Sequence, residues 1–251
     1  MKNKTEYAKR SYGLLWIIAG VLIVVGSARP ALAVKVIDVS ATKHNLGSGT
    51  PVTSNWYSTD ESEVCVFCHT PHNAISNYPL WNQYSTTMSF TVYSSGTLTA
   101  GVYATGLLPA NSMSRLCLSC HEGTIAINAL ANPGSTVGRP AMAGGISGDQ
   151  FSDVLPAGAG AYLSSDLSAM HPIGFDYNLS DAGDPEINDI TTGPLAQGLK
   201  FIKGAGGEDF LECVTCHDPH VNGEATGDPD YKFFLRIPNK SSALCLACHN
   251  K

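Results

Sequence analysis

Charged side chains are scarce in this chain of 251 residues: only 14% are charged, with 15 Lys and Arg against 21 Asp and Glu. The formal net charge at pH 7 is −6. Nucleic-acid binding requires basic side chains that neutralise phosphates, so no nucleic-acid partner is expected, nor any other polyanion. The length suits one large or two small domains.

Residues 1–33 hold five of the basic residues and one acidic residue, and they follow the pattern of an export signal. Residues 2–10 include four basic side chains, and Leu14–Val25 is apolar. Ala31-Leu-Ala33 has the small-x-small pattern of a cleavage site. We therefore predict a cleaved signal peptide and an exported mature chain beginning near Val34.

A membrane anchor is the alternative, because the uncharged run Ser11–Ala28 reaches the lower limit of a bilayer span. Cysteine is absent before Cys65, so no lipoprotein acylation site is available.

All eight cysteines fall into four Cys-x-x-Cys-His motifs, the signature of c-type haem attachment. The motifs are Cys65/Cys68/His69, Cys117/Cys120/His121, Cys213/Cys216/His217 and Cys245/Cys248/His249. Two thiols at this spacing add to the two vinyl groups of one haem, and the adjacent histidine becomes the proximal iron ligand. The sequence predicts four haem c groups.

Other uses of paired cysteines are a zinc site, a dithiol redox centre or disulfides. The gaps between successive pairs are 48, 92 and 28 residues, which miss the spacing of a zinc ribbon. With 8 histidines in the chain, four in this position by chance would be a coincidence on the order of one in a million.

Four histidines lie outside the Cys-x-x-Cys-His motifs, which equals the number of distal ligands that four haems need. They are His44, His72, His171 and His220. We predict bis-histidine ligation at every iron. Methionine ligation is the alternative, but the four methionines after residue 33 do not occupy equivalent places in the sequence repeat.

The mature chain is an internal duplication, with one dihaem half at residues 34–130 and another at 131–251. The first half reads His44-Asn-Leu-Gly, CHTPH and LCLSCH; the second reads His171-Pro-Ile-Gly, CHDPH and LCLACH. Each half thus holds two motifs and two spare histidines.

The CHxPH spacing restricts which iron the second histidine can reach. His69 and His72 are three residues apart, so on a helical turn they share one face. They cannot bind one haem iron from opposite sides of its macrocycle. His72 must therefore reach a different haem from the one bound by His69, and His220 a different haem from the one bound by His217. We expect this sharing to bring the two haems of each half into contact.

Between the motifs the sequence is rich in Gly, Ser, Thr and Asn, without long amphipathic helices. We predict a mostly coil fold with short helices and a few short strands, one or two of them in Ser85–Tyr103, wrapped around four covalent haems. The haems would form the apolar core, covered by aromatic side chains. Those expected on haem faces are Trp56, Trp81, Phe233 and Phe234.

An acidic segment, residues 180–189, carries four carboxylates: Asp181, Asp184, Glu186 and Asp189. Such a density of oxygen ligands suits calcium. The segment matches no calcium-loop pattern, so a solvated acidic turn is the preferred interpretation.

Catalysis at haem needs an open iron position, whereas electron transfer does not. Eight histidines for eight axial positions leave none open, so we predict an electron-transfer protein and not an enzyme.

The ordered motif set resembles the doubled-CXXCH multihaem cytochromes, and with four haems it is similar to the OmcE-like tetrahaem cytochromes that polymerise into extracellular filaments. The resemblance covers most of residues 40–251, with its specific residues in the motif blocks. It implies a continuous haem chain, end-to-end assembly with neighbouring copies, upstream periplasmic or outer-membrane cytochromes, and extracellular electron acceptors. In such filaments one distal histidine comes from the next subunit; His44 is the expected donor here.

Three other functions stay open. They are a monomeric periplasmic electron shuttle, a membrane-anchored quinol-oxidising cytochrome, and a multihaem reductase with a high-spin haem.

Overall fold

The computed structural model describes residues 38–49, 54–75, 80–96, 98, 108–134, 138–144, 153–221, 223 and 229–250. All of them belong to one compact unit, residues 35–251. The predicted signal peptide lies outside the described residues.

Among the described residues, none of the helices has the length and apolar character needed to cross a bilayer.

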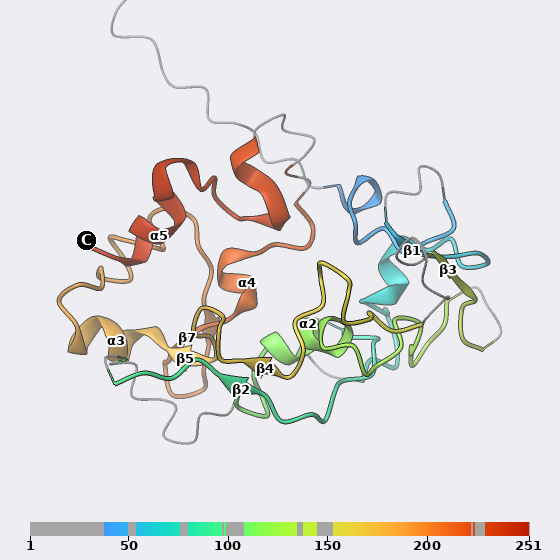
Figure 1. The fold of residues 1–251 in the computed structure, drawn as a ribbon, viewed down its shortest axis with the longest axis horizontal. Coiled ribbons are helices and arrows are strands. Elements are labelled where there is room, and N and C mark those ends of the chain that lie inside the picture. Colours follow the sequence, from blue (N-terminus) through green and yellow to red (C-terminus); the bar gives the residue numbers. More distant parts are fainter. Residues whose placement is uncertain are drawn as a thin grey trace, which may run out of the picture. The chain divides into compact units, whose positions relative to one another are not determined.

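Coil dominates the fold, and its regular elements are short (Figure 1). The helices are η1 (Val39–Ala41), η2 (Val64–Phe67), α2 (Ser114–His121), α3 (Tyr177–Gly183), α4 (Cys213–Cys216), η4 (Pro229–Phe234), η5 (Lys240–Ser242) and α5 (Ala243–Cys248). The strands are β1 (Trp56–Ser58), β2 (Thr91–Val92), β3 (Met142–Gly144), β4 (Asp166–Leu167), β5 (Phe175–Asp176), β6 (Ile202–Lys203) and β7 (Asp209–Leu211). The mostly coil prediction is confirmed for the described part of the chain.

The strands form three small sheets. β1 pairs antiparallel with β3, β2 pairs parallel with β4, and β5, β7 and β6 form an antiparallel sheet in that order. The first two sheets each join a strand before residue 130 to one after it. One predicted strand region, Ser85–Tyr103, contributes β2, while residues 99–103 lie outside the described part.

Three apolar clusters of polypeptide side chains hold the elements together. One surrounds Trp56 and Phe67, one surrounds Phe90 and Leu118, and one surrounds Phe175. Trp56 is 93% buried in the first cluster, beside Met142. The expectation that Trp56 covers a haem face is therefore wrong, because protein side chains already bury it.

A buried carboxylate joins α2 to α4, which carry the second and third motifs. Glu212 precedes α4 and accepts hydrogen bonds from the hydroxyl of Ser112 at 2.6 Å, from the backbone N–H of Ser114 at 3.2 Å and from the Ser114 hydroxyl. The Ser114 hydroxyl also accepts from the Cys213 N–H at 2.9 Å. These bonds fix two attachment motifs relative to each other.

Candidate functional site

Each Cys-x-x-Cys-His motif contains one helical turn. The backbone N–H of the histidine donates to the carbonyl of the first cysteine in three of them: His69 at 2.8 Å, His217 at 3.0 Å and His249 at 2.9 Å. His121 is the last residue of α2. A helical turn places the two cysteines, three residues apart, on one face, as attachment to one edge of a macrocycle requires.

A second backbone segment holds three of these histidines by an antiparallel bridge. The bridges are His69 to Trp81, His217 to Leu235 and His249 to Ile187. In each case the carbonyl of the second cysteine also accepts from the bridging segment: Cys68 from Asn82, Cys216 from Arg236 and Cys248 from Asn188. The chain therefore uses the same local scaffold at three motifs.

The eight cysteines are free thiols and form no disulfides. Burial raises the pKa of Cys68 to about 11, of Cys120 to about 12 and of Cys216 to about 11. A thiol redox centre works through a thiolate with a lowered pKa, which these three cysteines lack. The hydrogen bond with Cys117 lowers the pKa of Cys213.

Thiols of successive motifs lie close together. After burial, the charge of Cys68 is the next cause that raises the pKa of Cys120, and the charge of Cys248 is the next that raises the pKa of Cys216. Cys117 shares a side-chain hydrogen bond with Cys213. The motifs are thus neighbours in the order in which they occur along the chain.

Three motif histidines each face one of the spare histidines. The ring centres of His69 and His220 are 6.0 Å apart, those of His44 and His121 are 6.2 Å apart, and those of His171 and His249 are 6.3 Å apart. The ring planes meet at 15°, 78° and 69° respectively.

These separations fit a metal ion between the rings. With metal–nitrogen bonds of about 2.0 Å and about 1.1 Å from each nitrogen to its ring centre, two imidazoles on opposite sides of one metal stand about 6.2 Å apart. Among the described residues no group of three or more His, Cys, Asp or Glu side chains is gathered for a metal. A haem iron takes only two protein ligands, so paired imidazoles are the arrangement it needs.

Several of these imidazoles have their Nδ1 atom engaged by a carbonyl oxygen. The partners are the backbone oxygen of Ala161 for His121 at 2.7 Å, of Phe233 for His217 at 2.7 Å and of Pro172 for His171 at 2.9 Å. A ring that donates from Nδ1 keeps the lone pair of Nε2 for a metal. The hydrogen bonds thus select the tautomer that a ligand requires.

His44 is held as a neutral imidazole. Desolvation by burial, and secondly the charge of His121, lower the pKa of His44 to about 4. Its ring stacks on Phe234, with ring centres 4.4 Å apart. Neutral histidine is the form that binds metals.

The structure does not bring the remaining two histidines together. His72 and His217 are both exposed, and within the described part of the chain neither ring has another imidazole opposite it. The placement of His220 also differs from expectation: it faces His69 of the other half and not a motif of its own half. Pairing across the halves follows from packing of the chain, which the motif spacing does not determine.

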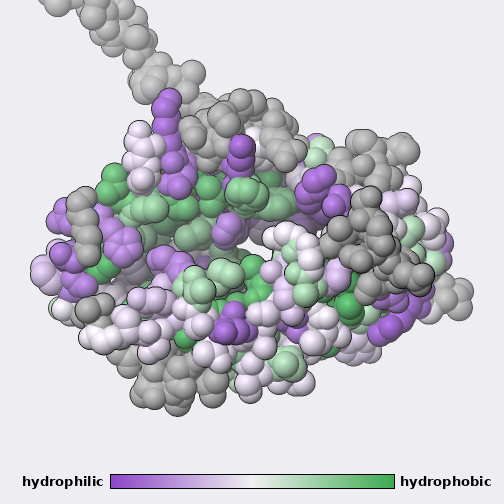
Figure 2. Space-filling model, viewed as in Figure 1, coloured by the Kyte–Doolittle hydropathy of each residue, from purple (hydrophilic) through white to green (hydrophobic). Residues whose placement is uncertain are grey.

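The aromatic side chains expected on haem faces have different surroundings. Trp81 makes an edge contact with His69 at 6.2 Å between ring centres, and Phe234 stacks on His44. Phe233 is 77% exposed. Figure 2 shows apolar side chains gathered around a hollow beside the C-terminal helices, a surface that suits a flat apolar group.

In the acidic segment two of the four carboxylates, Asp184 and Asp189, cap turns. Asp189 accepts from the backbone N–H groups of Thr191 at 3.0 Å and Thr192 at 2.9 Å, and Asp184 accepts from that of Glu186 at 2.9 Å. These bonds suit the acidic-turn interpretation.

Two residues beside the imidazoles were not assigned a role from sequence: Asp218 contacts His220, and Arg236 contacts Asp218. Phe233, expected on a haem face, instead contacts His217 through its backbone carbonyl. The one available signal was the difference between CHTPH and CHDPH, which places Thr70 and Asp218 at equivalent positions.

The chain matches no protein-family model and no curated protein sequence. Its function must therefore be inferred from its own residues.

Proposed function

We propose that this chain is a tetrahaem c-type cytochrome that carries electrons along a row of bis-histidine haems. The observation that carries the proposal is the set of three imidazole pairs with ring centres 6.0–6.3 Å apart, each containing one motif histidine. In this proposal the four motifs hold the haems through their cysteines, and the paired imidazoles are the axial ligands.

The sequence repeat assigns the fourth pair. His44 faces the second motif of its half, and His171 faces the second motif of the other half. His220 faces His69, the first motif histidine of the other half. By the same symmetry His72 belongs with His217, the first motif histidine of the second half.

A haem with two imidazole ligands exchanges one electron and needs no open coordination site. The chain contributes the ligands, fixes the tautomers of several of them through backbone carbonyls and carries the attachment cysteines on single helical turns. Thiols of motifs one and two, two and three, and three and four lie near enough to influence one another's pKa, which supports a continuous electron path in that order. We therefore propose an electron-transfer protein and not an enzyme.

We further propose that the chain is the subunit of an extracellular filament. His72 and His217 are both exposed, so the fourth pair is open to completion between two copies joined end to end. His44, the donor expected from the resemblance, faces His121 of its own chain, and His72 replaces it in the proposal. Upstream periplasmic or outer-membrane cytochromes would supply the electrons to the filament, and extracellular acceptors would take them.

Intact mass and absorption spectra of the protein purified from a haem-loading host test the electron-transfer proposal. Four haem adducts, low-spin spectra in both oxidation states of the assembled protein and no reaction with cyanide are the expected results. Fewer than four adducts would overturn the tetrahaem proposal. A haem that stays high-spin in the assembled protein and binds cyanide would favour a reductase.

Electron microscopy together with spectra at high and low protein concentration tests the filament proposal. Filaments should be low-spin throughout, and dilution to monomers should convert one haem in four to high-spin. Monomers that stay low-spin at every haem would place the His72–His217 pair within one chain and favour a periplasmic shuttle.

A further inference from the structure

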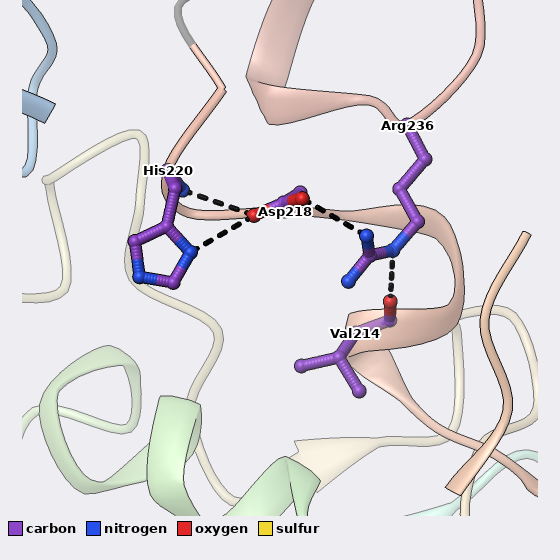
Figure 3. Close-up of polar contacts among 4 residues, drawn as sticks. All are labelled: Val214, Asp218, His220 and Arg236. Carbon is purple, nitrogen blue, oxygen red and sulfur yellow. Dashed lines mark hydrogen bonds and ion pairs between the residues drawn. The ribbon is translucent and has the colours of Figure 1, made fainter. Parts of the chain in front are cut away.

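The two CHxPH segments differ at one position whose side chain contacts a proposed ligand. Asp218 stands where the first half has Thr70. One carboxylate oxygen of Asp218 lies 3.1 Å from Nδ1 of His220 and also accepts the His220 backbone N–H at 3.2 Å (Figure 3). Thr70 instead donates its hydroxyl to the backbone carbonyl of His72 at 2.8 Å.

Arg236 holds the other oxygen of the same carboxylate. Its Nη1 lies 2.9 Å from Oδ2 of Asp218, and the side chains of Arg236 and Asp218 are only 13% and 15% exposed. Arg236 also donates from Nε to the carbonyl of Val214 at 2.6 Å (Figure 3). Its backbone N–H donates to the carbonyl of Cys216 at 2.8 Å. The third attachment motif therefore anchors the carboxylate that contacts His220.

A carboxylate on Nδ1 makes an imidazole a stronger electron donor to its metal than a neutral carbonyl does. Stronger donation stabilises oxidised iron over reduced iron and lowers the reduction potential. Other proposed ligands donate to neutral carbonyls: His121 to Ala161 and His217 to Phe233. Arg236 withdraws part of the negative charge from Asp218, because a close cation in a poorly solvated site interacts strongly with it.

We propose that Asp218 is a positioning residue that orients His220 and lowers the reduction potential of one haem, the one attached at Cys65 and Cys68, and that Arg236 limits this effect. The proposal rests on the proposed function, because it takes His69 and His220 as the ligands of that haem. It makes the electron affinity of the first haem depend on two residues from the second half of the chain.

Redox titration of the full haem-loaded protein, followed by optical and electron paramagnetic resonance spectra, tests this role. Asp218→Asn keeps a hydrogen-bond acceptor and removes the charge, so one of the four redox steps should move to higher potential while all haems remain low-spin. Arg236→Gln should move the same step to lower potential. That step should belong to the signal of the haem whose ligand planes are nearly parallel, since the His69 and His220 planes differ by only 15°.

Thr70→Val is the matched control. Thr70 stands at the equivalent position, and its hydroxyl bonds a backbone carbonyl and not an imidazole ring. The substitution should leave all four steps unchanged. If Asp218→Asn loads four low-spin haems and no step moves, the role of Asp218 is overturned while the electron-transfer proposal stands. If Asp218→Asn yields no loaded protein, Arg236→Gln decides: a downward shift of one step supports the role, and four unchanged steps overturn it. A parent protein without four low-spin haems would instead overturn the proposed function.

Discussion

The ring of Phe234 stacks on the imidazole of His44, with centres 4.4 Å apart and planes 12° from parallel. The preceding residue, Phe233, accepts a hydrogen bond from Nδ1 of His217 through its backbone carbonyl at 2.7 Å. Both phenylalanines have positive φ, 58° and 62°, a conformation that costs a non-glycine residue on the order of 1–3 kcal/mol. This strained dipeptide thus contacts proposed ligands of two different irons.

Replacing Phe234 by alanine should loosen His44. The aromatic contact contributes about 0.5–1.5 kcal/mol beyond the area that it buries. We expect the haem at Cys117 and Cys120 to show a partial high-spin fraction in the absorption spectrum, and a lower melting temperature. Phe233→Ala is the control: its side chain is 77% exposed and its carbonyl is retained, so spin state and stability should change little. Equal effects of both substitutions would contradict a specific role for the stack.

The sequence alone indicated the candidate attachment cysteines and the candidate histidine ligands, because haem attachment needs fixed residue types at fixed spacing. It could not predict which imidazoles face each other. The three-residue spacing says only that His220 turns away from the macrocycle of His217; its position opposite His69 depends on packing between distant segments. The bridges from His69 to Trp81 and from His217 to Leu235 are such contacts, and no local pattern marks them.

Core composition was predicted less well for the same reason. Trp56 pairs with Gly144 in the β1–β3 sheet and packs beside Met142, 86 residues further along the chain. Neither residue lies in a motif, so no sequence pattern indicated that Trp56 would be buried by protein. The scarcity of long helices, in contrast, follows directly from composition, with 25 glycines and 14 prolines in the chain.

Removing the charge of Glu212 should weaken the junction between α2 and α4. Its carboxylate is buried, and one oxygen, Oε2, accepts from both Ser112 and Ser114, so Glu212→Gln replaces a charged acceptor by a neutral one and weakens these bonds. We expect the free energy of unfolding of the loaded protein to fall by about 1–3 kcal/mol, measured by chemical denaturation. Glu63→Gln, at an exposed carboxylate, should change it by less than about 0.5 kcal/mol. Similar losses for both variants would show that the junction is not specific.

Replacing His72 by alanine should make one haem high-spin in the assembled protein, and that haem should be the one attached at Cys213 and Cys216. The reason is that His72 is the proposed sixth ligand of the iron held by His217. Absorption and resonance Raman spectra would count the high-spin fraction as one haem in four. Met170→Leu, at an exposed methionine, is the control for methionine ligation and should leave all haems low-spin. An unchanged spectrum for His72→Ala would remove His72 from the ligand set.

The angles between facing imidazoles predict different paramagnetic signals for the oxidised haems. The planes of His69 and His220 differ by 15°, whereas those of His44 and His121 differ by 78° and those of His171 and His249 by 69°. Ligand-plane orientation sets the splitting of the iron d orbitals, so near-parallel planes give a rhombic low-spin signal and near-perpendicular planes give a signal with a single large g value.

Electron paramagnetic resonance of the fully oxidised protein should therefore show at least one rhombic signal and two with a large g value. His220→Ala should remove a rhombic signal and leave the other two, because it takes the distal ligand from the near-parallel pair. Loss of a large-g signal in this variant would mean that His220 is not the distal ligand of the haem at Cys65 and Cys68. The ligands of that haem would then have to be reassigned, together with the proposed influence of Asp218 on it.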